Sequence, residues 1–323
     1  MMMLHRALFT ALLCFPLLVF AQQNYPSKPI RLIVPYPAGG ANDIFARPIA
    51  KKISEQLGQQ VVIDNRAGAS GVIGAQLVAS AQSDGYTLLA TSGSLTLIPL
   101  TMKKAPFDVL RDFTCIVAAA TSTTVVVIHP SLPVQSMKEL AEYGRKNPGV
   151  LKYGTAGAGR MQHLTGETLA HAINTKLIQV SYKGGHQALI DLLGGHVSMG
   201  VLHLSTVLPH VKAGRLRALA VAEEHRSKAY PDIPTAAESG FPKFAMPEPY
   251  LGFAGPARLP SAVVQKLNAE VNKALLTNEV RTALEGAGYI ITPGTTPEYF
   301  TGLQEKTFRT YQRLVKDVGL TYD

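Results

Sequence analysis

Short apolar runs alternate with amphipathic stretches along most of the chain. Ile30 to Val34 is the kind of apolar run that forms a buried strand, and apolar residues then recur at 45, 49, 53 and 57, on one face of a helix. The same alternation predicts strands at 61–63, 87–90, 125–128 and 216–222, helices at 43–57, 71–80, 136–146 and 260–284, strand–turn–helix units in 151–173 and 178–193, and a last helix that begins at Thr296-Pro297. Strands that alternate with helices predict an α/β protein with mostly parallel sheets.

Helix-terminus signals support several of these boundaries. Gly58 ends the helix that begins near Asp43, and Ser136 with Glu139 forms a capping box at the start of another. Pro48 falls inside the first of these helices, where it either lies near the first turn or kinks the helix. Thr296-Pro297 matches the preference of proline for the first helical position.

The first 21 residues have the pattern of a secretory signal peptide. His5 and Arg6 precede an apolar run from Ala7 to Phe20, and the small residue Ala21 suits cleavage before Gln22. The alternative is an uncleaved membrane anchor, but the run is short for the roughly 30 Å of hydrocarbon that a helix must cross. We therefore expect residues 1–21 to be removed and the mature chain to be periplasmic.

Composition narrows the class of protein. The chain has 323 residues and a mass of 34.6 kDa, which suggests two domains. Of its residues, 46% are hydrophobic and 16% are charged, and this composition excludes a disordered chain. Two cysteines exclude a disulfide scaffold, and Cys115 is expected to be a buried thiol. The net charge of +9 favours anionic partners. The basic residues form no block, so nucleic acid is not an expected partner.

Two glycine-rich turns carry the candidate chemistry. Pro35 to Asp43 and Tyr153 to Gly159 each lie between an expected strand and an expected helix. Helix N-termini expose unpaired N–H groups and a partial positive charge, so such turns can bind anions. Two turns, one from each lobe, could hold one carboxylate through backbone groups near Ala38, Gly39, Gly40, Thr155, Ala156 and Gly157, with Thr91 and Ser92 as further polar liners. Alternatively, each glycine-rich turn only connects its strand to its helix and binds no ligand.

The sequence does not match the common motifs for nucleotide binding, metal binding or nucleophilic catalysis. Gly154 to Gly159 has the glycine spacing of a P-loop, but Arg160-Met161 stands where Lys-Ser/Thr is required. The sequence has no G-x-S-x-G and no H-E-x-x-H. His163, His196, His203 and His210 are more readily structural or surface residues than metal ligands. We expect no catalytic residue, no metal and no cofactor.

The order of many short motifs resembles a known family, the Bug-type extracytoplasmic solute receptors of tripartite tricarboxylate transporters. The resemblance spans essentially the whole mature chain. It rests on the motifs Tyr25-Pro26-Ser27-Lys28-Pro29-Ile30, Val34 to Gly40 with Asp43, Asp84-Gly85-Tyr86-Thr87-Leu88, Pro130 to Val134, Tyr153 to Gly159 with His163, Tyr182-Lys183-Gly184-Gly185, Asp191 to Gly195, and Tyr230 to Thr235. Each motif is weak alone, but their number and order are specific.

The resemblance implies a type II periplasmic-binding-protein fold, in which two α/β lobes are joined by two crossovers and a small carboxylate binds between them. Lobe one would comprise residues 22–123 plus 224–323, and lobe two residues 124–223. The implied receptor is a monomer that delivers its ligand to membrane subunits of a transporter. The combined ligand-binding candidates are Tyr36, Ala38, Gly39, Gly40, Asp43, Thr91, Ser92, Thr155, Ala156, Gly157, Arg160, His163, Gly184 and His203.

Two departures from the family pattern bear on the ligand. The run Val197 to His203 lacks the acidic residues and the aromatic residue that the family usually shows there, which counts against an amino acid as ligand. Arg160 stands where the family commonly has a small polar residue. It either favours ligands with a second acidic group or points to solvent.

Two other functions remain open at this point. A secreted α/β enzyme would need a nucleophile and a base, and no motif supplies them. A receptor of the same fold could instead present its ligand to a signalling protein, which the residues do not distinguish from transport.

Overall fold

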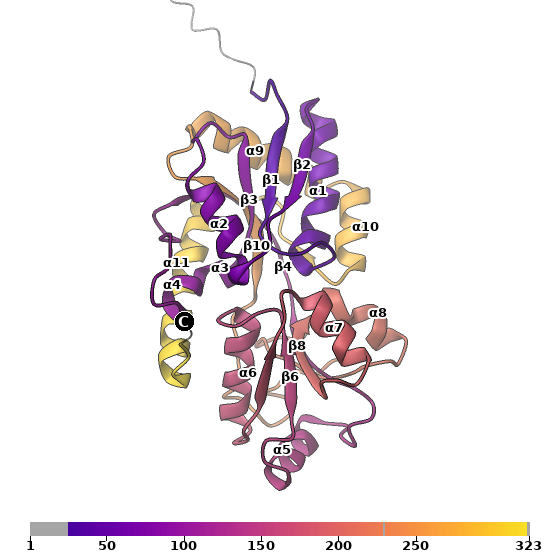
Figure 1. The fold of residues 1–323 in the computed structure, drawn as a ribbon. Coiled ribbons are helices and arrows are strands. Elements are labelled where there is room, and N and C mark those ends of the chain that lie inside the picture. Colours follow the sequence, from indigo (N-terminus) through magenta and orange to yellow (C-terminus); the bar gives the residue numbers. More distant parts are fainter. Residues whose placement is uncertain (1–24, 229, 322–323) are drawn as a thin grey trace, which may run out of the picture.

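The computed structural model describes residues 25–228 and 230–321, so the expected signal peptide lies outside the described residues. The chain forms two lobes, each built on one β-sheet with helices on both faces (Figure 1). This is the α/β two-lobe fold that the sequence predicts. Among the described residues, no helix combines the length and the apolar character needed to cross a membrane.

The first lobe holds a six-stranded sheet in the order β11-β4-β10-β3-β1-β2. Alternate residues of β1 face opposite sides: Ile30, Leu32 and Val34 pack under α1, α9 and α10, whereas Ile33 packs under α2. The elements of this lobe are β1 (Ile30–Val34), α1 (Ala41–Leu57), β2 (Val61–Asn65), η1 (Ala69–Gly71), α2 (Val72–Ala79), β3 (Thr87–Ser92), α3 (Gly93–Thr96), α4 (Ile98–Thr101), β4 (Phe113–Thr121), β10 (Tyr250–Pro256), α9 (Ser261–Leu275), α10 (Asn278–Gly286), β11 (Ile290–Ile291) and α11 (Pro297–Val318).

The second lobe repeats this plan on a five-stranded sheet in the order β7-β6-β8-β5-β9. In β5, Val126 and Ile128 pack with α5 and α6, and Val125 and Val127 pack with α7 and α8. Its elements are β5 (Thr124–Ile128), α5 (Met137–Lys146), β6 (Lys152–Thr155), α6 (Met161–Ala172), β7 (Ile178–Ser181), α7 (Gly185–Leu193), β8 (Met199–His203), α8 (Leu204–Lys212) and β9 (Arg217–Val221).

Both sheets are mixed. The expectation of mostly parallel sheets holds for the direction of β1, β2, β3 and β4 and of β6, β7, β8 and β9, and it fails for β5, β10 and β11. β1 runs parallel to β2 and β3, and β6 runs parallel to β7 and β8. The first strand after each crossover runs the other way: β10 is antiparallel to β3 and β4, and β5 is antiparallel to β8 and β9. The short strand β11 is antiparallel to β4 as well.

The chain crosses between the lobes twice. It passes directly from β4 to β5 through Ser122 and Thr123, and it returns between β9 and β10. Residues 222–246 still pack on the second lobe, with Ala236 and Phe244 in its core and a bridge between Glu223 and Met246. The expected boundary at residue 224 stays a prediction, and this packing favours a later one.

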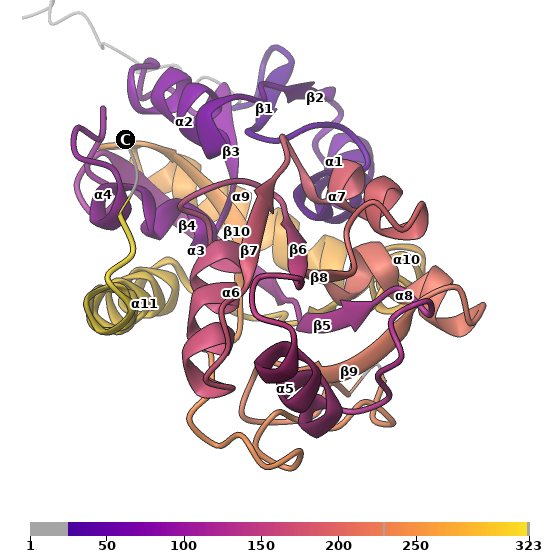
Figure 2. The same cartoon turned by 60° about the horizontal axis from the view of Figure 1, so that its bottom comes forward.

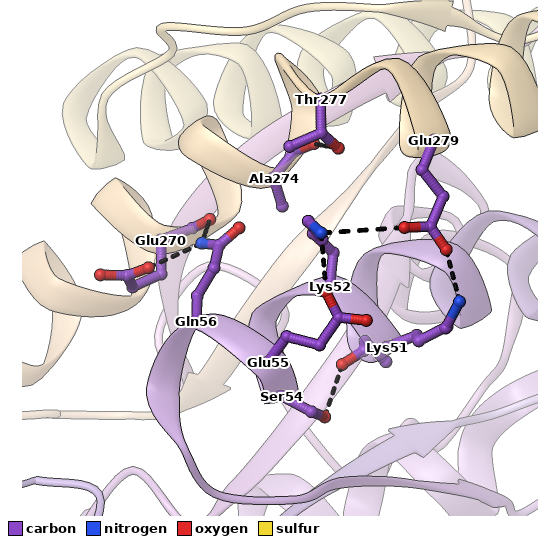
Figure 3. Close-up of polar contacts among 10 residues, drawn as sticks. Lys51, Lys52, Ser54, Glu55, Gln56, Glu270, Ala274, Thr277 and Glu279 are labelled. Atoms are coloured by element: carbon purple, nitrogen blue, oxygen red, sulfur yellow. Dashed lines mark hydrogen bonds and ion pairs between the residues drawn. The ribbon is translucent and has the colours of Figure 1, made fainter.

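α11 contacts both lobes. Its residues Tyr311 and Val315 belong to the core cluster of the second lobe, and the helix lies beside α6 in both views (Figures 1 and 2). At the opposite side of the first lobe, α1 is held to α9 and α10 by polar contacts (Figure 3). Gln56 donates to the backbone carbonyl of Glu270 at 2.8 Å, and Lys51 and Lys52 pair with Glu279.

Most expected elements are present with shifted ends. Ser136 accepts the N–H of Glu139 at 3.2 Å, as the capping box predicts, and Gly58 adopts the left-handed conformation at the end of α1. Pro48 is accommodated within α1. The helix expected at 260–284 is two helices, α9 and α10, because the chain turns at Leu276 and Thr277 begins a new helix.

Candidate functional site

A cavity of about 110 Å³ lies between the two lobes. The first lobe lines it with the turn after β1 and the start of α1, and the second lobe with the starts of α6, α7 and α8 and the end of β8. The lining residues are Tyr36, Pro37, Ala38, Gly40, Ala41, Asn42, Ala156, Arg160, Gln162, Gly184, Gly185, His186, Gln187, Leu202, His203 and Thr206.

Four helices begin at this cavity. The residues that precede the first turns of α1, α6, α7 and α8 are Gly40, Arg160, Gly184 and His203, and all four line the cavity. None of the four helices has a side-chain cap. Their first-turn N–H groups and the positive ends of their dipoles therefore favour an anion in the cavity.

The helices α2, α3, α4, α9 and α10 also lack a side-chain cap, so the convergence of four helix N-termini, and not the lack of caps, distinguishes the cavity. Ser136 caps α5 and Thr296 caps α11, and neither residue lines the cavity. Glycine at the start of α1 and α7 leaves no side chain between the helix terminus and the cavity.

Arg160 adds a full positive charge. Its residue surface is only 4% exposed, its Nη1 donates to the carbonyl of Ala156 at 2.8 Å, and its Cζ lies 3.8 Å from the ring centroid of Tyr36. Tyr36 belongs to the first lobe and Arg160 to the second, so this cation–π contact spans the cleft. Of the two alternatives for Arg160, the one in which it points to solvent is therefore wrong.

Further contacts join the lobes beside the cavity. Ser70 of η1 donates to the carbonyl of Ala158 at 2.8 Å, and Thr101 of α4 donates to the carbonyl of Gly159 at 3.3 Å. A Cβ at Gly184 would lie 3.2 Å from the ring of Pro37. The second glycine-rich turn is thus in direct contact with the first lobe, and the structure is a closed arrangement of the lobes.

The turns that carry the helix N-termini are fixed by side chains four residues downstream. The N–H of Gly39 donates to Asp43 at 2.9 Å, and the N–H of Gly159 donates to Nδ1 of His163 at 3.1 Å. The N–H of Lys183 in the third turn donates to Oε1 of Gln187 at 3.1 Å in the same way. Asp43 and His163 therefore hold the turns and are not among the lining residues.

Asp43 is a buried carboxylate whose oxygens are both engaged. Arg47 and Asn65 donate to it at 2.8 and 2.9 Å, in addition to Gly39. Burial alone raises the pKa of this carboxyl, but the hydrogen bonds from Arg47, Gly39 and Asn65 outweigh burial and hold the pKa below its usual range. Asp43 stays ionised without a ligand as its partner.

His203 lies at the end of β8 and lines the cavity. Burial, and secondarily the charge of Arg160, lowers the pKa of His203 to about 3. Its Nδ1 lies 3.1 Å from the hydroxyl of Ser122, on the first crossover. The imidazole is therefore neutral at physiological pH and brings no second positive charge to the cavity.

The structure brings together half of the residues proposed from sequence. Seven of them line the cavity: Tyr36, Ala38, Gly40, Ala156, Arg160, Gly184 and His203. The other seven do not: Gly39, Asp43, Thr91, Ser92, Thr155, Gly157 and His163. Thr155 illustrates the reason, since it is fully buried and its hydroxyl accepts from Gln179 at 2.8 Å.

Several lining residues were missed from the sequence. Asn42, Gln162 and His186 each stand second in a helix that begins at the cavity. No pattern within the chain marks these positions until the helices are known to converge.

No Asp or Glu lines this cavity within the part of the chain that the structure describes. A ligand cation would find no acidic side chain as its partner there. The described residues also contain no group of three or more His, Cys, Asp or Glu that could hold a metal ion.

Comparison with known proteins identifies the family. Residues 45–320 match the model of the tripartite tricarboxylate transporter family receptor. The chain belongs to this family. BugT of Bordetella pertussis is 34% identical over 300 residues, which cover 92% of this chain and 91% of BugT.

Solved structures of this receptor family share the fold. Rpa4515 of R. palustris, solved with adipate, is 30% identical with a TM-score of 0.88, over 92% of this chain and 99% of that one. The periplasmic binding protein BugD is also 30% identical, with a TM-score of 0.87 over 93% of this chain and all of BugD. The resemblance drawn from the motifs and the type II binding-protein fold that it implied are confirmed.

Proposed function

We propose that this receptor captures a small organic carboxylate in the cavity between its lobes. The observation that carries the proposal is the convergence of four helix N-termini and the buried Arg160 on a cavity that no Asp or Glu among the described residues lines. Such a site favours anions and disfavours cations. An amino acid, whose ammonium group needs an acidic partner, is therefore a poor ligand. The adipate bound to Rpa4515 supports the same class of ligand.

In this proposal the two glycine-rich turns hold one carboxylate. Ala38 and the first residues of α1, Ala41 and Asn42, line the cavity from the first lobe, and Ala156 and Gly184 line it from the opposite side. Gly39, Gly157 and Thr155 act by shaping the turns. Because the ligand contacts both lobes, it stabilises the closed arrangement over an open one.

The receptor role also implies export and a membrane partner. We propose that residues 1–21 are removed, that the mature chain works in the periplasm as a monomer, and that it delivers its ligand to membrane subunits of a tripartite transporter. The family membership and the periplasmic relative BugD support this. The intact mass of the exported protein tests the cleavage: a chain that begins at Gln22 is expected, and a full-length chain in the membrane fraction contradicts it.

Thermal unfolding in the presence of candidate ligands tests the binding function. A ligand that binds only the native state raises its stability by RT ln(1 + [L]/Kd), or about 2.7 kcal/mol at a hundredfold excess over Kd. Mono-, di- and tricarboxylates and amino acids form the panel. We expect carboxylates to raise the melting temperature and amino acids not to. A panel in which no carboxylate does so contradicts the proposed function.

A further inference from the structure

Two side chains of the second lobe that line the cavity each have a buried polar atom without a hydrogen-bond partner among the described residues. Nε of Arg160 and Oε1 of Gln162 are buried and have no hydrogen-bond partner in the described part of the chain. Both residues line the cavity. A third lining residue, Tyr36, also has an unpaired hydroxyl, but that group lies beside Gly71, within the first lobe. Buried polar groups normally have partners, so the two second-lobe atoms need an explanation.

The side chain of Arg160 is held in place, and the N–H of its buried Nε has no partner among the described residues. Its Nη1 is bonded to Ala156, and its guanidinium lies on the ring of Tyr36. One carboxylate at the helix N-termini would not neutralise the site, because four helix dipoles and a full guanidinium charge meet there. A second anionic group on the ligand would meet the Nε–H of Arg160 in a charge-assisted hydrogen bond.

Gln162 needs the opposite partner. It is 1% exposed and is the second residue of α6, and its unpaired atom is an acceptor. A carboxylate has no proton to donate to it. An ammonium group could donate, but no Asp or Glu among the described residues lines the cavity to balance the added charge. A neutral hydroxyl fits, because it can donate to the amide oxygen or accept from the amide nitrogen, whichever of the two faces it.

We propose that Arg160 and Gln162 set the ligand class of this site: a hydroxylated dicarboxylic acid. The helix N-termini hold its first carboxylate, Arg160 binds its second acidic group, and Gln162 accepts a hydrogen bond from its hydroxyl. The cavity volume of about 110 Å³ limits this ligand to a short chain. The inference rests on the proposed function as a carboxylate receptor.

Three four-carbon acids separate the two contributions. Butyrate and succinate differ by one carboxyl group, and succinate and malate differ by one hydroxyl. We expect calorimetry on the wild-type protein to give succinate an affinity about 10- to 100-fold above butyrate, the range for a hydrogen bond to a charged group. Malate should bind a further two- to tenfold more tightly, roughly the effect of a neutral hydrogen bond.

Two variants then act on different ligand pairs. Arg160→Met should remove most of the difference between succinate and butyrate and leave the ratio of malate to succinate unchanged. Gln162→Met should remove most of the difference between malate and succinate and leave the ratio of succinate to butyrate unchanged. Arg145→Met is the matched control, because Arg145 lies in the same lobe, bonds to the carbonyl of Ile173 and does not line the cavity. Arg160→Lys provides a second test that keeps the charge if the methionine variant fails to fold.

The outcomes are distinct. Equal binding of butyrate and succinate by the wild type overturns the role of Arg160, as does an equal loss for both ligands in Arg160→Met. Equal losses of malate and succinate in Gln162→Met overturn the role of the hydroxyl, because the amide would then act on the carboxylates. Failure of every carboxylate in the wider panel to bind would instead reject the proposed function itself.

Discussion

Gly39 and Gly157 have backbone conformations that other residues rarely adopt. Their φ angles are +75° and +143°. The space around them differs, however. A Cβ at Gly39 would meet nothing within 4 Å, whereas one at Gly157 would lie 2.9 Å from both Cδ of Arg160 and Oγ of Ser70. Gly157 is therefore needed for two reasons, its own conformation and the closeness of the facing lobe.

This difference predicts different effects of the same substitution. Gly39→Ala should lower the free energy of unfolding by about 1–2 kcal/mol, the cost of a left-handed conformation. Gly157→Ala should additionally displace Arg160 and Ser70, and so reduce affinity for the ligand found in the panel by more than Gly39→Ala does. Denaturant unfolding and calorimetry measure the two effects. Equal affinities for the two variants would contradict the steric argument.

Asp43 should matter for stability through the turn that it holds. Asp43→Asn removes a charged acceptor of hydrogen bonds from Gly39, Arg47 and Asn65. We expect a loss of about 1.5–3 kcal/mol in the free energy of unfolding at pH 7. Since the pKa of Asp43 is lowered in the folded state, its contribution is present above the ordinary value of 3.8 and is lost as the pH falls through the folded value. A variant with wild-type stability at pH 7 would show that the turn does not depend on this carboxylate.

At the scale of elements, η1 is the part of the first lobe that reaches the second glycine-rich turn. Ala69 and Ser70 both have positive φ, at 44° and 56°, although neither is glycine. This conformation places the hydroxyl of Ser70 at the carbonyl of Ala158, across the cleft. The strained conformation of this turn thus has a structural role, because it positions Ser70 for a hydrogen bond between the closed lobes.

Ser70→Ala should therefore act on closure. The variant loses a hydrogen bond that exists only between closed lobes, so we expect ligand affinity to fall about two- to tenfold, mainly through faster dissociation. Ser80→Ala is the matched control, since Ser80 ends α2 and its hydroxyl donates to the carbonyl of Gln76 in the same helix. Stopped-flow dissociation measures the rate. An unchanged rate in Ser70→Ala would show that this contact does not hold the lobes together.

Local patterns predicted the elements well and their directions poorly. Strand β1 and helix α1 could be predicted because a short apolar run and a period-3.6 pattern are local features of the sequence. The direction of β10 could not, because it depends on where the chain returns after a whole lobe. The turns at the cavity were predictable from their glycines, but Asp43 and His163 were taken for ligand contacts. Sequence spacing alone does not show that a side chain bonds back to its own turn.

At the scale of the whole molecule, the two crossovers meet at Glu223. This residue follows β9, is 3% exposed, and its Oε1 accepts the N–H of Thr124, the first residue after the other crossover, at 2.7 Å. Its Oε2 has no hydrogen-bond partner among the described residues. Burial raises the pKa of Glu223 to about 8. The hydrogen bond from the N–H of Thr124 offsets part of this increase, and the negative charge of Glu248 adds to it. A neutral carboxylic acid therefore joins the two segments that cross between the lobes.

This protonation makes stability depend on pH in a defined direction. In the unfolded chain the carboxyl ionises near its ordinary pKa of 4.5, whereas in the folded protein it stays protonated up to about 8. Between these values the folded state holds a proton that the unfolded state has released. The contribution of Glu223 to the free energy of unfolding thus decreases as the pH rises from 4.5 to 8 and is constant above 8.

Glu223→Gln should remove this dependence while keeping an oxygen for the N–H of Thr124. The variant should gain stability relative to the wild type as the pH rises, by on the order of 3 kcal/mol between pH 5 and pH 8. Glu224→Gln, at the exposed neighbouring residue, is the matched control because it removes one carboxyl of the same kind. Denaturant unfolding at pH 5, 6.5 and 8 measures the difference. Parallel pH profiles for Glu223→Gln and the wild type would mean that Glu223 is already ionised in the folded protein, and the junction would then have to hold a buried charge.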